Sequence, residues 1–260
     1  MMPEYEYSLL LIPILFLIAF LYSSVGLGGG SSYTAILAIF SINYLAIPTI
    51  SLTLNLFVTT IGSLTFILKR HVRLNLLLPF LLSSMPLAYF GGTLHLPKNI
   101  FLWILWASLV FVIVRIYLVE QVDFKFDLSR RQQLFISIVT GMLLGFIAGV
   151  VGIGGGIYLV PLILVLGLGN AKQAAACGAI FVWVNSAVGL SARFVHQPID
   201  LNEYLPLIAA VIAGGLLGSY LSASHYSTRT IEKVLGLVVV IAVILLGKRL
   251  FADLYIRLLA

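Results

Sequence analysis

Charged residues are scarce in this sequence of 260 residues. Asp, Glu, Lys and Arg together make up 9% of the chain, whereas 61% of the residues are hydrophobic. A soluble domain needs polar residues to cover its surface, and average soluble chains carry roughly 25% charged residues. The composition therefore excludes a soluble globular protein and predicts an integral membrane protein.

Carboxylates are rarer still, and none lies in the middle of an apolar segment. All nine fall near the ends of the chain or in connections, at positions 4, 6, 120, 123, 127, 200, 203, 232 and 253. Cation-coupled carriers and proton pumps usually keep a carboxylate at membrane depth. The absence of such a residue argues against a cation as substrate and favours an anion.

Cysteine and clustered histidine are also missing. The single cysteine, Cys177, excludes an intramolecular disulfide and a metal site built from several cysteines. The histidines lie in or near connections, and no two are spaced i, i+4; they are His71, His95, His196 and His225. We therefore expect no metal site and no cofactor.

The basic residues do not form one patch, although the net charge is +6. They are scattered through short connections, as the positive-inside bias of cytoplasmic loops requires, and this pattern gives no support for a nucleic-acid partner. The amino-terminal MMPEYEY has no Lys or Arg, so it lacks the basic region of a signal peptide. We expect the first apolar run to be a retained first helix.

Long apolar segments are abundant. Many reach the ~20 residues that a helix needs to cross a ~30 Å hydrocarbon core, and they lack the alternation of an outer-membrane barrel. The sequence predicts an all-α polytopic membrane protein with ten apolar segments, at about 8–24, 31–41, 45–68, 74–94, 100–119, 132–151, 157–168, 172–195, 203–223 and 234–250.

These segments divide into two groups of five, with residues 1–119 as a first repeat bundle and 132–260 as a second. Between them lies a charged linker, 120–131, expected in the cytoplasm. The halves align at mid-segment asparagines, Asn55 with Asn185, and again at Asn75 and Pro79 with Asn202 and Pro206. An internal repeat predicts two bundles related by pseudo-two-fold symmetry, with the substrate bound between them.

The second segment of each half is too short to span a bilayer by itself. If both short segments are re-entrant, the chain makes eight crossings with its amino terminus inside. If flanking loops complete them, it makes ten crossings with the terminus outside, and the repeats are inverted. Both alternatives place KRHVR (69–73) and the linker in the cytoplasm, and the positive charges do not decide between them.

Two glycine cassettes precede the short segments: GLGGG at 26–30 and GIGGG at 152–156. Consecutive glycines allow positive φ and close approach, and the helix that follows directs unpaired N–H groups at the same space. In a membrane this arrangement can bind an anion without a buried lysine. Ser31 and Ser32 follow the first cassette and can cap the helix or donate hydroxyls. The alternative is close helix packing through small residues.

Polar side chains at membrane depth complete the candidate site. Asn55 and Asn185 are near the middle of long segments, where a buried amide needs hydrogen-bond partners. They either form hydrogen bonds between helices or face a cavity. Ser186, next to Asn185, adds a hydroxyl to that polar position. Arg193 follows Asn185 by eight residues, roughly 12 Å along a helix. It either extends to the membrane interface or attracts the anion.

Two tandem halves, each with an apolar helix, a G-[LI]-G-G-G cassette, a short helix and a mid-helix Asn, resemble the sulfite exporter TauE/SafE family of membrane transporters. The resemblance covers roughly residues 8–250. It implies transport of sulfite, or of an organosulfonate such as sulfoacetate, across the bacterial cytoplasmic membrane. Many members carry a Thr-Ser pair where this chain reads CGAIF (177–181), which affects the choice of substrate.

The sequence thus predicts a multi-pass secondary carrier of the bacterial inner membrane, a monomer or homodimer, that moves a small sulfur-containing anion by alternating access. Its partners are that anion and membrane lipid. The predicted binding residues are Gly26, Gly28, Gly29, Gly30, Ser31, Ser32, Asn55, Gly152, Gly154, Gly155, Gly156, Asn185, Ser186 and Arg193. A passive anion channel is the alternative. An enzyme is not expected, because no Ser/His or Cys/His pair lies at matched depth.

Overall fold

The computed structural model describes residues 4–24, 28–118, 129–221 and 228–259. Within these ranges every regular element is helical, and no strand is present. Gly26 and residues 120–128 of the predicted linker lie outside the described residues, so the linker stays a prediction. The described part agrees with the predicted all-helical class.

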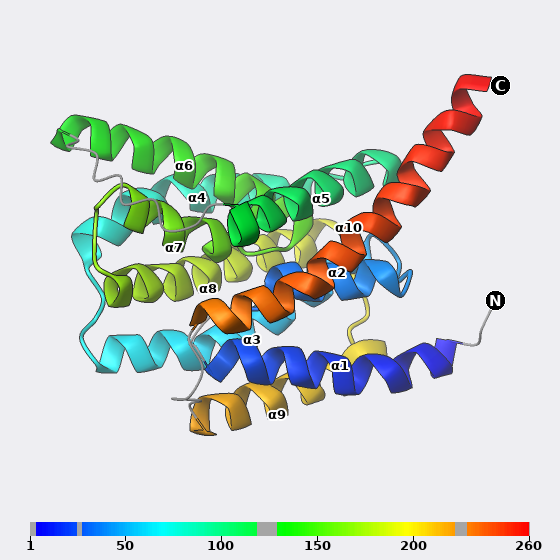
Figure 1. Cartoon of the computed structure of the whole chain (residues 1–260), viewed down its shortest axis with the longest axis horizontal. Coiled ribbons are helices and arrows are strands. Elements are labelled where there is room, and N and C mark those ends of the chain that lie inside the picture. The colour runs from blue at the N-terminus through cyan, green and yellow to red at the C-terminus, as the bar shows by residue number, and fades with distance from the viewer. Residues whose placement is uncertain (1–3, 25–27, 119–128, 222–227, 260) are drawn as a thin grey trace.

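Ten α-helices in the described ranges follow the predicted apolar segments closely (Figure 1). They are α1 Glu4–Ser24, α2 Gly30–Ile39, α3 Ala46–Leu68, α4 Leu74–Thr93, α5 Lys98–Ile113, α6 Arg130–Val151, α7 Gly156–Val165, α8 Ala171–His196, α9 Leu205–Leu221 and α10 Thr228–Leu259. A π-helical turn, Val114–Leu118, continues α5, and a 3₁₀ turn, Asn202–Tyr204, precedes α9.

Seven helical spans in the described residues are long and apolar enough to cross a membrane, which makes this a multi-pass helical membrane protein. They are Ala46–Leu68, Leu74–Thr93, Lys98–Leu118, Arg130–Val151, Ala171–His196, Asn202–Tyr220 and Lys233–Tyr255. Three shorter apolar helical stretches are Leu10–Ser24 within α1, Gly30–Ile39 and Gly156–Val165. By length alone the count is therefore seven, fewer than the predicted eight to ten.

Local sequence signals explain where the central helices begin. The Ser129 hydroxyl accepts the backbone N–H of Gln132 while the Gln132 side chain accepts the Ser129 N–H, a capping box that starts α6. Asn170 and Gln173 form the same arrangement at the start of α8. These caps fix the first turns of the two helices that flank α7.

Helices α4 and α6 pack closely side by side and run in the same direction. Glycines of α6 meet the backbone of α4 in parallel order: Gly141 with Phe80, Gly145 with Ser84, and Gly149 with Ala88. A Cβ at any of these glycines would overlap an α4 carbonyl oxygen, so small residues are needed for the contact. Helices α1 and α9 form a second parallel pair, in which Gly214 and Gly218 meet Phe16 and Phe20.

Helices α3 and α8 are antiparallel. Gly189, late in α8, lies against Leu52, early in α3, whereas the indole of Trp183, earlier in α8, donates to the hydroxyl of Thr60, later in α3. Helices α5 and α10 are also antiparallel. Tyr117 donates to the Lys233 carbonyl, and the Trp106 indole donates to the Val243 carbonyl. The start of α1 and the end of α10 lie at the same end of the bundle in Figure 1.

The ends of α4 and α8 meet. The His95 ring nitrogen Nε2 lies 3.0 Å from the His196 carbonyl oxygen, and Gln197 donates to the Leu94 carbonyl at 2.8 Å. Since α4 and α6 are parallel, the three helices α4, α6 and α8 all run the same way. The chain therefore returns from one end of the bundle to the other between the end of α6 and the start of α8, a stretch that contains α7.

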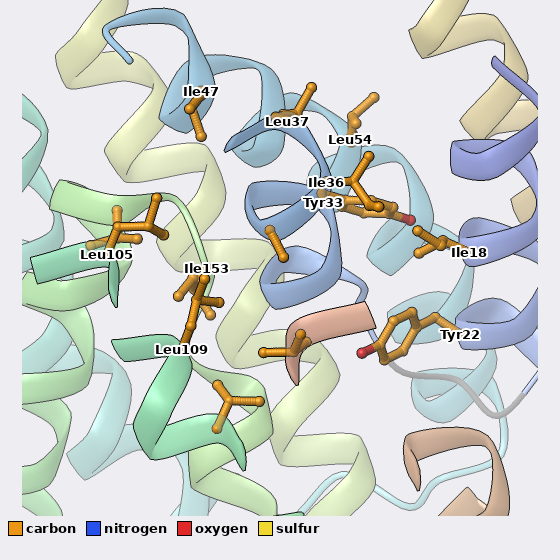
Figure 2. Close-up of a cluster of buried hydrophobic side chains, with 14 of the residues drawn as sticks. Ile18, Tyr22, Tyr33, Ile36, Leu37, Ile47, Leu54, Leu105, Leu109 and Ile153 are labelled. Carbon is orange, nitrogen blue, oxygen red and sulfur yellow. The ribbon is translucent and has the colours of Figure 1, made fainter. Parts of the chain in front are cut away.

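The apolar core surrounds the short helix α2. Tyr22 of α1 and Tyr33 of α2 lie with Ile18, Ile36 and Ile153 in one buried cluster (Figure 2). Helix α2 is almost entirely buried, from Gly30 to Ala38. Its sequence, GSSYTAILAI, combines hydroxyl-bearing and apolar residues, and the helix buries both kinds.

Candidate functional site

The two glycine cassettes touch each other at the centre of the bundle. A Cβ at Gly30 would overlap the carbonyl oxygen of Ile153 and would lie 2.5 Å from Nδ2 of Asn55. A Cβ at Gly154 would lie 3.2 Å from the same Asn55 nitrogen. The fold therefore brings two distant parts of the chain into direct backbone contact, and glycine is required there because no side chain fits.

The second cassette also needs glycine for its backbone conformation. Gly152, Gly154 and Gly155 have φ values of 85°, 80° and 80°. Gly152 ends α6 in the left-handed conformation and donates its N–H to Ala148, and Gly155 is the N-cap residue of α7. The first cassette differs, because its N-cap residue Gly29 has φ −92°. At Gly29 the requirement is space, since a Cβ would lie 2.7 Å from the Tyr33 ring.

Asn55 links the two cassettes. Its side chain is fully buried and donates to the Gly152 carbonyl at 3.3 Å. Ser51, one turn earlier on α3, donates to the same carbonyl at 2.8 Å and lies 3.4 Å from the Gly30 carbonyl. Oδ1 of Asn55 has no hydrogen-bond partner in the described part of the chain. An unsatisfied buried amide oxygen is costly, about 1–3 kcal/mol, and marks this position as unusual.

Asn185 and Ser186 are neighbours on α8, the helix that packs against the cassettes through Val182. Both are fully buried, and the Asn185 amide donates to the Phe181 carbonyl of its own helix at 2.9 Å. Oδ1 of Asn185 and the Ser186 hydroxyl have no partner among the described residues. Ser186 lies near the second cassette, 3.6 Å from the position that a Cβ at Gly154 would take.

Both short helices begin at the cassettes without a side-chain cap. Of the two roles predicted for Ser31 and Ser32, capping is wrong: α2 starts at Gly30 with Gly29 as its N-cap residue, so both serines lie inside the first turn. Ser31 instead lines a cavity, and the Ser32 hydroxyl lies 3.1 Å from the Tyr22 hydroxyl. The positive ends of both helix dipoles thus lie at the junction of the cassettes.

A small cavity lies at this junction, with a volume of about 10 Å³. It is lined by the end of α1, both cassettes and α8, through Tyr22, Gly28, Ser31, Ile153, Gly156, Ile157, Gly178, Ala179 and Val182. That volume is about enough for one water molecule and is too small for an oxyanion of four or more heavy atoms. The junction is closed in this conformation.

Tyr22, Tyr33, Ser51 and Val182 belong to this region but were not among the predicted binding residues. Ser51 could have been found, because it precedes Asn55 by one helical turn and so shares its face. Nothing in the sequence marks Val182, whose methyl groups fill the space beside Gly154 and Gly156. Tyr33 is completely buried with an unpartnered hydroxyl among the described residues, which only packing reveals.

Arg193 lies away from this junction. It is 3% exposed, and its Nη2 donates to the carbonyls of Gly149 and Val150 at 2.9 and 2.8 Å, at the end of α6. Its Nη1 donates to the side-chain oxygen Oε1 of Gln197 at 3.2 Å. The guanidinium therefore lies inside the protein, where it lines a second cavity with Gln197.

Metal-binding residues are sparse. Among the described residues, no three His, Cys, Asp or Glu side chains lie close enough to hold a metal ion. Cys177 is buried, and its neighbours on α8 include Gly178 and Ala179, which line the central cavity. The groups available to a ligand at the junction are thus backbone N–H groups, the Asn55 amide and hydroxyls.

An all-helical bundle with many apolar spans and a small polar site between the helices defines a multi-pass membrane protein of the transporter type. The chain belongs to the sulfite exporter TauE/SafE family, whose family model matches residues 11–246. The resemblance noted from the cassettes is thereby confirmed over most of the chain.

Curated relatives carry transporter names. A probable membrane transporter protein of Sinorhizobium fredii is 30% identical over 232 residues, covering 87% of this chain and 93% of the relative. A probable membrane transporter protein of Methanocaldococcus jannaschii is 26% identical over 253 residues, covering 85% and 91%. No solved structure matches this chain significantly. A role in membrane transport is therefore supported across almost the whole length.

Proposed function

We propose that this protein is a secondary carrier for a small sulfur-containing oxyanion, such as sulfite or an organosulfonate like sulfoacetate. The observation that carries the proposal is the junction of the two glycine cassettes, where two uncapped helix N-termini lie around one cavity. Helix N-termini bind oxyanions through backbone N–H groups and the dipole. The family description names sulfite as the exported substrate.

The chemistry of the junction favours an anion over a cation. Its lining residues include no Asp or Glu. Asn55 and Ser186 lie close to the cassettes and add an amide and a hydroxyl donor, and we propose that Asn185, the counterpart of Asn55 in the second half, adds another amide. Such donors replace the water that an oxyanion loses when it enters a membrane protein, and they suit the several oxygens of a sulfite or sulfonate group.

We also propose that the two halves are inverted repeats. The helix pairs support this: α1 packs along α9 as α6 packs along α4, and each pair joins the first helix of one half to the fourth helix of the other. The self-related pairs, α3 with α8 and α5 with α10, are antiparallel, as a two-fold axis in the membrane plane requires.

The directions of the helices favour ten crossings over eight. Since α4, α6 and α8 run the same way, α7 and its loops carry the chain back across the bilayer, which agrees with the alternative in which flanking loops complete the short segments. The basic segment KRHVR (69–73) precedes α4 and is expected in the cytoplasm. The joined ends of α4, α6 and α8 then lie on the opposite side, and the amino terminus lies outside.

The closed junction supports the proposal of transport by alternating access. A cavity of about 10 Å³ cannot admit the anion, so one repeat bundle has to move relative to the other to open the junction to each side in turn. A passive channel would need a continuous opening instead. The carrier acts in the bacterial inner membrane as a monomer or homodimer, and no chemical conversion of the anion is proposed.

The test is electrophysiology of purified protein in liposomes on a solid-supported membrane. Sulfite, thiosulfate, sulfoacetate, taurine and sulfate are applied in turn, with and without a proton gradient. A saturable current for one or two sulfur anions supports an electrogenic carrier and identifies its substrate. If all currents are absent, labelled counterflow is measured next, and its absence for every sulfur anion refutes the proposal. Flux without saturation or counterflow would indicate a channel.

A further inference from the structure

Arg193 is a buried cation whose charge is not matched by any described carboxylate. Its hydrogen-bond partners are neutral oxygens: the carbonyls of Gly149 and Val150 and the side-chain oxygen of Gln197. Its Nε has no partner in the described part of the chain. A buried charge is strongly unfavourable unless an opposite charge or enough hydrogen bonds stabilise it. Arg193 therefore has two of its five N–H groups, the Nε–H and one on Nη1, and part of its charge left for another group.

The carbonyls at the end of α6 account for only part of that charge. The C-terminal end of a helix dipole is equivalent to about half an elementary negative charge. No Asp or Glu lines the cavity that Arg193 faces. Asp200, the described carboxylate that follows α8 most closely, is exposed and accepts the backbone N–H of Asn202.

This second cavity is separate from the cassette junction. Its volume is about 10 Å³, and Pro48, Val150, Arg193 and Gln197 are among its lining residues. Gly152 lies against Pro48, which lines the second cavity: a Cβ at Gly152 would be 2.7 Å from the Cα of Pro48. The next residue, Ile153, lines the central cavity. The turn from Gly152 to Ile153 thus separates the two cavities. Arg193 is placed just outside the junction, on the side where α4, α6 and α8 end.

We infer that the cavity beside Arg193 and Gln197 is a second anion subsite, which an oxyanion occupies before it passes the Gly152–Ile153 turn to the junction. The anion pairs with the guanidinium through Nε. The inference takes its ligand class from the proposed function. It places the subsite at the end of the bundle opposite KRHVR (69–73), hence on the extracytoplasmic side.

The subsite also explains the arrangement of its neighbours. Gln197 accepts from Arg193 and donates to Leu94, so it holds the guanidinium while linking α8 to the end of α4. Leu45, 37% exposed, lies at the rim as the N-cap residue of α3. The present volume holds about one water molecule, so an anion enters when this rim moves outward.

The test measures local anion preference by cysteine labelling, independently of transport. In a Cys177→Ala background, Leu45→Cys places a thiol at the rim, and intact cells are treated with membrane-impermeant methanethiosulfonates carrying either a sulfonate or a trimethylammonium group. The ratio of anionic to cationic labelling rates should fall about three- to tenfold in Arg193→Gln and stay within about twofold in Arg193→Lys, as expected for the loss of one nearby charge. Leu205→Cys, exposed at the start of α9 and absent from the cavity lining, is the control position whose ratio should not change.

A second arm needs no change at Arg193 and covers the case in which Arg193→Gln does not fold. Sulfoacetate or sulfate should slow labelling of Leu45→Cys in protein that retains Arg193, whereas neutral methanesulfonamide should not. An unchanged ratio in folded Arg193→Gln, or the absence of protection by either anion, would overturn the subsite.

The two proposals fail differently. Adding Gly154→Ala should abolish transport but leave the labelling ratio at Leu45→Cys unchanged, because this glycine is not part of the second cavity. If no sulfur anion is transported but the Arg193-dependent ratio and protection persist, the subsite stands and the substrate is another oxyanion. If transport of a sulfur anion is found without them, only the subsite is refuted.

Discussion

Replacing Gly154 by alanine tests whether the cassette turn is both packed and functional. Gly154 has φ +80°, and an added Cβ would lie 2.8 Å from a methyl carbon of Val182. Ordinary contact begins at 3.4 Å, so either Val182 or the turn has to move by at least about 0.6 Å. The variant therefore combines backbone strain with overpacking at the centre of the site.

Gly167 provides a matched control. It also has positive φ, at 63°, but nothing lies within 4 Å of its added Cβ. A left-handed alanine costs about 1–2 kcal/mol at either position. Overpacking adds about 1–3 kcal/mol at Gly154 alone, so we expect losses of about 1–2 kcal/mol for Gly167→Ala and about 2–5 kcal/mol for Gly154→Ala.

The assays are the free energy of unfolding in mixed micelles and anion uptake in proteoliposomes. Gly167→Ala should transport at close to the normal rate, whereas Gly154→Ala should lose uptake even where folded protein is recovered. Adding Val182→Ala removes the methyl group that causes the overlap, and a double-mutant cycle should give a favourable coupling of at least about 1 kcal/mol. Equal destabilisation at Gly154 and Gly167, or normal uptake by folded Gly154→Ala, would refute the reasoning.

Three further predictions concern substitutions at or near the junction and at Tyr158. Asn55→Leu should abolish uptake. It should change the free energy of unfolding by less than about 1.5 kcal/mol, because it removes one hydrogen bond together with an unsatisfied oxygen. Uptake at the wild-type rate would exclude a binding role for Asn55. Gly29→Ala and Gly155→Ala should each abolish uptake with protein still in the membrane, since both added Cβ atoms would meet aromatic rings within 3.0 Å; normal uptake by both would contradict the site. Tyr158→Phe removes a buried hydroxyl that donates to a carbonyl of α5. The free energy of unfolding should therefore fall by about 0.5–1.5 kcal/mol, with uptake retained. Loss of uptake with an unchanged free energy of unfolding would indicate instead that the hydroxyl takes part in transport.

The positions of the helices were largely predictable from the sequence, because long apolar runs and capping residues are local signals. The start of α8 at Asn170 and Gln173 is one example, since the capping box involves residues only three apart. The roles of Ser31 and Ser32 were not predictable in the same way. Whether a serine next to glycine caps a helix depends on where the first turn begins, and that is decided by the contact of Gly30 with Ile153.

The direction of the short helices also depended on tertiary contacts. Ten residues of α7 are compatible with a re-entrant segment or with part of a crossing, and charges in loops do not distinguish the two. The contacts of His196 with His95 and of Arg193 with Gly149 favour the crossing, because they join the end of α8 to the ends of α4 and α6, which the re-entrant alternative would place on the opposite side.

By itself the sequence determined the membrane class, the helical segments, the two glycine cassettes and the family. These depend on composition, periodicity and short motifs, which are properties of neighbouring residues. Only the tertiary structure decided that the cassettes touch, that Asn55 bonds to the Gly152 carbonyl, and that Arg193 turns inward to the end of α6. Such contacts join residues far apart in the chain, and they exist only where close helix packing excludes lipid and water and leaves backbone carbonyls as the available partners.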